Sequence, residues 1–274
     1  MLVRTGMLAL WLAVSSLPAM ASEPFAWPDG RKAAVSLAYD DALDSQLDNA
    51  LPALDRHGLK ASFYLQLSRG PVRARMAEWR AAAANGHELG NHTLFHQCSG
   101  KGPGREWVAP AQDLDEVTVA QMAEQVDLAN TMLAAIDGRS ERSFTVPCGD
   151  TMARDGDYLQ AVADRFVGAK VGGGAVVADM AALDPLAVPV LAPEGLDGAQ
   201  LIALVEEAGR RGTMVNLTFH GIGGDYLATS VEAHAQLLAY LHAHRDDYWT
   251  APFIDIVRWL RLQRAGKAAG QAAD

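Results

Sequence analysis

Short apolar segments alternate with longer helical patterns along most of the chain, and this alternation constrains the fold more than any other feature of the sequence. Residues 33–39 form a mostly apolar run that predicts a buried strand, residues 43–56 carry a helical pattern, and residues 61–67 predict a second strand. Repeated units of this kind indicate a parallel sheet with crossover helices. About seven of them suit a distorted barrel of the (β/α)7 type, with an open doubly wound sheet as the alternative.

The remaining elements follow the same pattern. The most regular helix is predicted at 119–136, where apolar residues recur at spacings of three and four and Gly138 follows. In both candidate architectures, chemistry is expected at the carboxyl ends of the strands. The further predicted strands cover residues 87–90, 143–146, 166–171, 214–219 and 249–254.

The first 21 residues are predicted to be a signal peptide. A basic start precedes an apolar run at 7–14, and small residues stand before a cleavage site after Ala21. The run is shorter than the ~20 residues that a spanning helix needs. We therefore expect one domain over 22–264, a flexible tail over 265–274, and a periplasmic or secreted location, which is an oxidising one.

Charge and cysteine content exclude several classes of partner. Lys and Arg total 23 against 33 Asp and Glu, a formal net charge of -10, so nucleic acid is not an expected partner. No second long apolar run follows the signal, so we expect no stable membrane span after cleavage. Separately, we expect the protein to be a monomer. The two cysteines allow one bridge at most, and no Cys-x-x-Cys pair suggests a structural zinc site.

Acidic and imidazole residues follow three of the predicted strands. Asp40 and Asp41 end the first strand, where adjacent carboxylates either need a nearby cation or cap the following helix. His92 and His96, after the third strand, can converge on one metal if the segment turns helically. His220 follows the strand at 214–219, and the period of two directs it into the barrel mouth. Alone, each histidine could equally be a hydrogen-bonded structural residue.

Together these residues predict a catalytic metal site. One carboxylate and two imidazoles make three ligands with a position left for water, and the other carboxylate is then free to act as a base. In these residues and the motifs around them, the sequence resembles the NodB-type polysaccharide deacetylases, also called carbohydrate esterase family four. The resemblance spans about residues 33–260 and rests on YDDA at 39–42, GHELGNHTLFH at 86–96, VPCG at 146–149 and LTFH at 217–220.

The resemblance implies a NodB-homology fold and a role for each motif residue. Asp41, His92 and His96 would hold the metal, usually zinc, although some family members work with cobalt or another divalent ion. Asp40 would be the general base, and His220 would protonate the departing amine or alcohol. The metal and the backbone N–H of Cys148 would stabilise the developing oxyanion.

The sequence departs from the family pattern at three positions. Thr145 stands where members commonly carry an arginine that orients the base. Arg142, nearby in sequence, and Lys170, near the end of the fifth predicted strand, are the candidates for the missing cation. Ala42 replaces the usual glycine. Cys148 replaces the usual tyrosine, of which only the backbone N–H is needed.

The two cysteines fall beside the second and third motifs. Because an exported protein meets oxidising conditions, we favour a disulfide between Cys98 and Cys148 over two free thiols. A third possibility is that a soft Cys98 thiolate joins the metal. Flat aromatic faces suit sugar rings, and the candidates for substrate binding are Trp107, Tyr226 and Trp249.

The sequence thus predicts an exported metal-dependent deacetylase that hydrolyses N-acetyl or O-acetyl groups of a polysaccharide or oligosaccharide. One alternative is a non-catalytic carbohydrate-binding protein on the same fold, which the missing arginine motivates. The other is a metallohydrolase of small esters.

Overall fold

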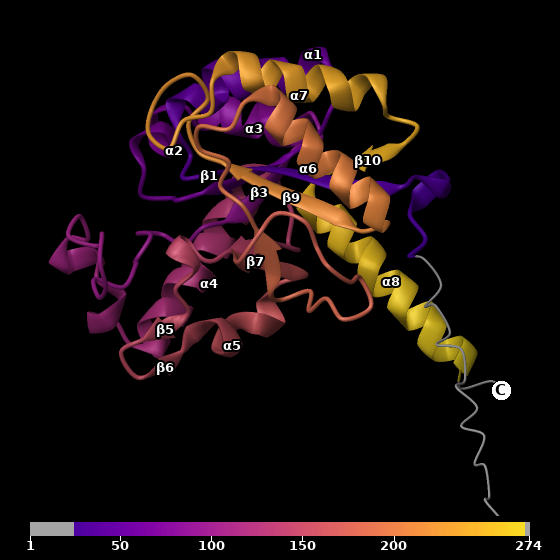
Figure 1. Ribbon diagram of the computed structural model, residues 1–274. Helices are drawn as coiled ribbons and strands as arrows, with labels where there is room; N and C mark the ends of the chain where they lie inside the picture. Colours follow the sequence, from indigo (N-terminus) through magenta and orange to yellow (C-terminus); the bar gives the residue numbers. More distant parts are fainter. Residues whose placement is uncertain (1–24, 272–274) are drawn as a thin grey trace, which may run out of the picture.

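The centre of the molecule is a barrel of parallel strands (Figure 1). The computed structural model describes residues 25–271, so the predicted signal peptide lies outside the described residues. The barrel strands are β1 (Ala33–Asp40), β2 (Ser62–Leu65), β3 (Glu88–Asn91), β4 (Ser143–Thr145), β7 (Gly168–Gly172), β8 (Val188–Val190) and β9 (Met214–Phe219). Around the barrel the strand order is β1, β2, β3, β4, β7 and β8, and β9 pairs with β1. A bridge between Leu191, just after β8, and Leu217 in β9 closes the ring and confirms the predicted (β/α)7-type barrel.

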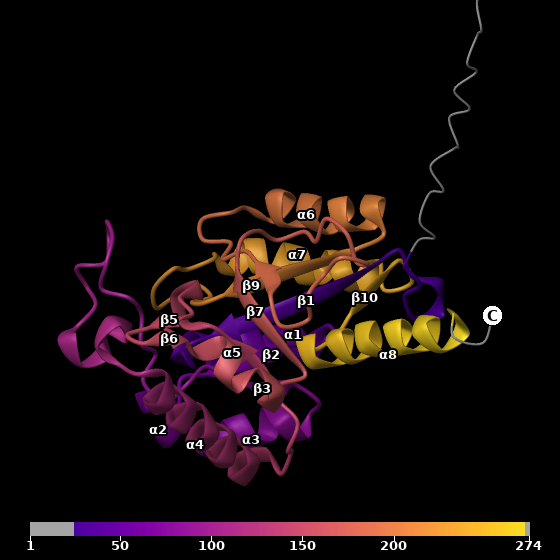
Figure 2. The ribbon, with the colours of Figure 1, turned by 90° about the horizontal axis from the view of Figure 1, so that it is seen from below.

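Helices cover the barrel wall on two sides. They are α1 (Leu51–Arg56), α2 (Gly70–Ala74), α3 (Met76–Ala84), α4 (Val119–Asp137), α5 (Tyr158–Val162), α6 (Gly198–Arg211), α7 (Val231–Ala243) and α8 (Phe253–Gln271). Figure 2 shows α6 and α7 on one side of the strands and α2, α3 and α4 on the other. A short strand, β10 (Tyr248–Thr250), pairs with the start of β1, and β5 (Met152–Ala153) and β6 (Gly156–Asp157) form a separate hairpin. Among residues 25–271 we find no helix with the length and apolarity that a membrane span requires.

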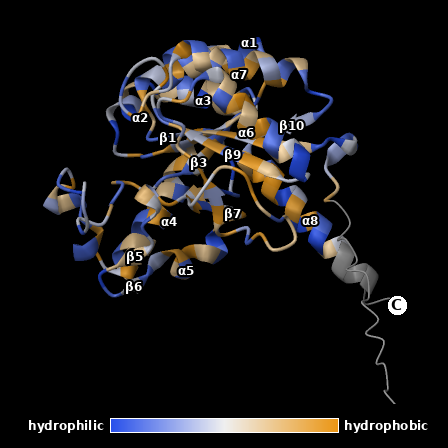
Figure 3. Cartoon of the chain, in the orientation of Figure 1, coloured by the Kyte–Doolittle hydropathy of each residue, from blue (hydrophilic) through white to orange (hydrophobic). Residues whose placement is uncertain are grey.

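The alternation of side chains along β1 directs Asp40 into the barrel. Val35, Leu37 and Tyr39 belong to the core between the barrel wall and the helices. The neighbouring strand β9 is also largely apolar (Figure 3). Ala34 and Ala38 instead pack in the second core, inside the barrel. Asp40 shares the parity of these two alanines, so its side chain enters the barrel at the carboxyl end of β1.

Two predicted elements have different bounds in the structure. The helix expected at 43–56 is divided into a π-helical segment, Gln46–Ala50, and α1, next to Pro52, which supplies no backbone N–H. The strand expected at 249–254 is limited to β10, because the chain turns at Pro252 into α8.

Two further segments differ from expectation. β8 was not predicted, since it has only three residues and a proline at its centre. Helix α8 continues to Gln271, through most of the segment 265–274 that we expected to be a flexible tail. The alanines in that segment have high helix propensity, which accounts for the continuation.

Candidate metal centre and active site

The carboxyl ends of the barrel strands open into one cavity of about 770 Å³. The loop after β1 contributes Asp41, the loop after β3 contributes His92 and His96, and the residue after β9 is His220. Thus the structure brings together the residues that the sequence predicted to meet.

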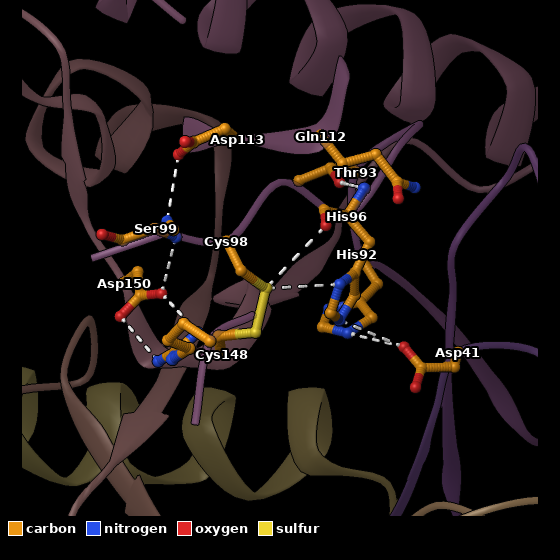
Figure 4. The surroundings of a disulfide bond; sticks show 12 residues. Asp41, His92, Thr93, His96, Cys98, Ser99, Gln112, Asp113, Cys148 and Asp150 are labelled. Carbon is orange, nitrogen blue, oxygen red and sulfur yellow. Dashed lines mark hydrogen bonds and ion pairs between the residues drawn. A yellow bond between two sulfur atoms is a disulfide. The ribbon is translucent and has the colours of Figure 1, made fainter. Parts of the chain in front are cut away.

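Asp41, His92 and His96 converge on a common position (Figure 4). The Oδ1 atom of Asp41 lies 3.2 Å from Nε2 of His92 and 3.3 Å from Nε2 of His96. Ligand atoms about 2.0–2.1 Å from a tetrahedral ion are about 3.3 Å apart, so these spacings fit a zinc-sized cation. Oδ1 is also buried without a hydrogen-bond partner among the described residues, which is costly unless a cation binds it. These three residues could therefore hold a divalent metal.

The surroundings of the two imidazoles select the ring atoms available to a metal. Nδ1 of His92 lies 2.8 Å from the carbonyl oxygen of Thr145. A carbonyl only accepts, so Nδ1 carries a proton and Nε2 is the atom left for a ligand bond. Burial lowers the pKa of His92, but the charges of Asp40 and Asp41 raise it above its usual value. Metal binding must then displace a proton at lower pH, which makes the affinity pH-dependent.

At the second imidazole, His96, burial dominates. It lowers the pKa of His96 to about 4, so this ring is neutral near pH 7, the form that binds metals. Burial alone would raise the pKa of Asp41. The neighbouring imidazole of His92, with smaller contributions from His96 and His220, nevertheless holds that pKa well below its usual range.

Backbone strain is concentrated in the loops of this cavity. Non-glycine residues rarely adopt a positive φ angle, and such strain persists only where surrounding structure enforces it. Ala42, at φ 57°, stands where the family pattern has glycine, which explains that preference. Apart from Asp29, the non-glycine residues with positive φ among those described are Asp41, Ala42, Thr93, His96, Cys148, Asp225 and Leu227.

Asp40 lies beside a buried cation. Its Oδ1 atom is 3.6 Å from Nζ of Lys170, which is itself 3.0 Å from Oγ1 of Thr218 and 3.9 Å from the ring centre of Tyr64. Burial lowers the pKa of Lys170 to about 8, so the ammonium remains mostly charged at pH 7. Lys170 is the register partner of Thr145 on β4, so the cation lies at the level of the barrel where the family pattern has arginine.

Arg142, the other candidate cation, does not reach Asp40. It precedes β4, at the opposite end of that strand, and its Nη2 atom lies 2.6 Å from Oδ1 of Asp137. Both side chains are buried, so the pair belongs to the structural core of the barrel base.

A disulfide joins Cys98 and Cys148, whose Cα atoms are 5.8 Å apart. It connects the loop after β3 to the loop after β4, directly beside the histidines (Figure 4). Sγ of Cys98 lies 3.5 Å from Nδ1 of His96. With both sulfurs in the bond, neither is a free thiolate for the metal, so the third possibility raised for Cys98 does not apply. Cys148 lines the cavity, where its backbone N–H was predicted to stabilise an oxyanion.

The aromatic candidates have three different placements. Trp107 lines the cavity mouth with 61% of its surface exposed. Tyr226 also lines the cavity, but its hydroxyl donates to Oδ2 of Asp41 at 2.6 Å, a contact that the sequence did not indicate. The structure corrects the prediction for Trp249. It lies in β10, next to the amino end of β1, and packs against Trp27 and Trp259, far from the carboxyl ends of the strands.

His220 lies in the cavity with one nitrogen toward the proposed metal ligand. Its Nε2 atom is 3.8 Å from Oδ2 of Asp41, and its buried Nδ1 has no hydrogen-bond partner among the described residues. Arg69 is a further cavity residue that sequence reasoning missed, since it lies at the start of a short helix without a motif.

A distorted (β/α)7 barrel that gathers two aspartates and three histidines at its strand ends is the NodB-type fold. The family model described as polysaccharide deacetylase matches residues 28–164, half of the chain. The chain belongs to the polysaccharide deacetylase family.

Curated relatives match over short stretches. A stretch of 76 residues is 33% identical to gellan lyase from Bacillus sp, covering 27% of this chain and 3% of that protein. A stretch of 103 residues is 28% identical to the uncharacterized protein YlxY from Bacillus subtilis, covering 38% of this chain and 27% of that protein. This chain therefore spans well under a third of either relative.

Solved structures show the same fold at low identity. A protein from Mycobacterium smegmatis described as a polysaccharide deacetylase superposes with a TM-score of 0.63 at 15% identity, covering 88% of this chain and 94% of that chain. Peptidoglycan deacetylase PdaC from Bacillus subtilis gives 0.55 at 14% identity, with coverages of 88% and 97%. A wild-type pseudoenzyme of carbohydrate esterase family four from Bacillus anthracis gives 0.54 at 16% identity, with coverages of 84% and 66%. Active and inactive proteins thus share this fold, and the local site must distinguish them.

Proposed function

We propose that this chain is an exported, metal-dependent deacetylase that hydrolyses N-acetyl or O-acetyl groups of a polysaccharide or oligosaccharide. The observation that carries the proposal is the cluster of Asp41, His92 and His96, whose buried carboxylate oxygen has no hydrogen-bond partner among the described residues, with the second carboxylate of Asp40 beside it. Residues 22–264 would form the catalytic domain, and the first 21 residues would direct a monomeric protein to the periplasm or the medium.

The metal would be held by Asp41, His92 and His96. Two imidazoles and one carboxylate are a ligand set suited to zinc, and cobalt or another divalent ion could replace it. When bound, the ion would supply Lewis-acid polarisation of the acetyl carbonyl and of the attacking water.

The protein's own groups would then move the protons. Asp40 would accept a proton from the attacking water, with Lys170 orienting its carboxylate. The backbone N–H of Cys148 would donate to the carbonyl oxygen as negative charge develops on it. His220 would protonate the departing nitrogen or oxygen. Trp107, exposed at the cavity mouth, would contact a sugar ring.

The alternative of a non-catalytic binding protein rested on the missing arginine at position 145. Lys170 weakens that argument, because a buried ammonium lies 3.6 Å from Asp40. The intact ligand cluster likewise favours an enzyme over a binding protein.

Acetate release tests the proposal. Purified protein would be incubated with acetylated chitin, peptidoglycan, xylan and exopolysaccharide fragments and with small acetyl esters, with zinc or cobalt and with chelator. We expect release from at least one oligosaccharide, loss with chelator and recovery on adding metal. No release from any substrate would refute the enzyme, sugar binding without turnover would support the binding protein, and release from small esters alone would support the small-ester hydrolase.

A further inference from the structure

The two carboxylate oxygens of Asp41 have separate surroundings. Oδ1 faces the Nε2 atoms of His92 and His96. Oδ2 accepts the hydroxyl proton of Tyr226 at 2.6 Å. When one oxygen of a carboxylate is hydrogen-bonded to a fixed donor, the other oxygen points in a defined direction. Hydrogen bonds of this kind orient metal ligands in proteins generally.

Arg69 orients the Tyr226 hydroxyl. Its Nη2 atom contacts the hydroxyl oxygen, and its guanidinium carbon lies 5.3 Å from the centre of the tyrosine ring. A guanidinium only donates, so the hydroxyl accepts from Arg69 and its own proton is left for Asp41.

The loop that carries Tyr226 is tied to the loop that carries Asp41. Oδ2 of Asp225 accepts from the backbone N–H of Ser45 at 2.9 Å, and the Ser45 hydroxyl accepts from the N–H of Ile222 at 3.1 Å. Asp225 and Leu227, on either side of Tyr226, have φ angles of 59° and 47°. Two strained residues around one side chain, anchored to the loop that it contacts, indicate that the position of that side chain is enforced.

We propose that Tyr226 is a positioning residue for the metal site, which orients Asp41 toward the ion through its hydroxyl. This role replaces the sugar contact expected from the sequence, and it rests on the metal site of the proposed function. Losing an outer hydrogen-bond partner of a ligand costs about 10- to 100-fold in metal affinity, and we expect Tyr226→Phe to bind zinc at least about tenfold more weakly.

Metal titration tests this inference without an activity assay. Zinc affinity would be measured by competition with a chromophoric chelator, and the visible absorption of bound cobalt would report the coordination geometry. Tyr226→Phe should lower the affinity and change the cobalt spectrum. Tyr240→Phe is the matched control, because it removes a hydroxyl that contacts Glu206 on the exposed surface, and it should change neither.

The outcomes separate this inference from the metal site itself. Wild-type affinity and an unchanged cobalt spectrum in Tyr226→Phe would overturn the role of Tyr226 and leave the metal site standing. No metal binding by the wild type would overturn the metal site and this inference with it. If Tyr226→Phe lowers the Tm of the metal-free protein, Arg69→Met becomes the deciding variant. We expect that variant to weaken zinc binding several-fold, and an unchanged affinity would overturn the proposal.

Discussion

Removal of the Cys98–Cys148 disulfide should destabilise the protein by an amount set by the length of the loop that the disulfide closes. The two cysteines are 50 residues apart in sequence. Chain-entropy arguments give about −14 cal/mol/K for a closed loop of that length, or about 4 kcal/mol of unfolding free energy at 25 °C. For a domain of this size about 1 kcal/mol corresponds to about 2–4 °C, so Tm should fall by about 8–16 °C.

The double variant Cys98→Ala/Cys148→Ala is the perturbation to use. Cys98 is 1% exposed, so alanine leaves no polar group buried there. Thermal unfolding would be followed by circular dichroism in chelator for the oxidised wild type, the wild type reduced with a phosphine, and the variant. The reduced wild type and the variant should unfold together, and the reductant should not affect the variant.

Single variants provide a further check. Either cysteine alone opens the same loop, so Cys98→Ala and the double variant should have nearly equal Tm values. A difference between oxidised wild type and double variant below about 2 °C, less than about 1 kcal/mol, would refute the argument from loop closure.

Four other variants test the remaining assignments. Asp40→Asn should lower kcat about 10²- to 10⁴-fold without weakening zinc binding, as measured by acetate release and chelator competition. Trp107→Ala should raise KM for oligosaccharides several-fold and leave kcat for a small acetyl ester unchanged. Arg142→Met leaves a buried carboxylate unpaired and should cost about 3–5 kcal/mol in urea unfolding with little effect on kcat. Burial lowers the pKa of Lys170 to about 8 from the usual 10.5, so between these pH values the unfolded chain binds more protons than the folded protein. The free energy of unfolding of the wild type, measured in chelator, should therefore rise by up to about 3 kcal/mol relative to that of Lys170→Met as pH increases from 8 to 10.5. A flat difference across those pH values would contradict the burial of a charged lysine.

The barrel could be predicted from sequence because its strands are continuous apolar runs followed by helices. The period of two along the strand at 214–219 placed His220 at the barrel mouth, and the structure has it in the cavity. Where an element was short and contained a proline, as in β8, the pattern had too few residues to be recognised. The sequence also did not show which end of the barrel Trp249 would occupy, because this depends on the register in which β10 pairs with β1. Trp249 pairs with Ala34 at the start of β1, which explains the error.

The contact between Tyr226 and Asp41 had no sequence signal. It depends on how the loop after β9 turns back over the barrel, and that path depends on particular turns. A Cβ atom at Gly221 would lie 1.9 Å from the carbonyl oxygen of Gly224, so this turn requires glycine at 221. Glycines permit such a turn but do not identify the residue that it presents.

Lys170 did carry a signal, which the structure now explains. A lysine between Ala169 and Val171 in a buried strand has no water to solvate it, so it requires an anion within the barrel. Asp40 is that anion, and the lysine's register partner on β4 is Thr145, a small residue that leaves room for the ammonium. Neighbouring parallel strands place register partners at the same level of a barrel, so a cation can move from one strand to the next and still face the same carboxylate. The missing arginine is therefore poor evidence against the proposed role of Asp40 as base, because that role needs a cation beside the carboxylate and not a particular strand to supply it.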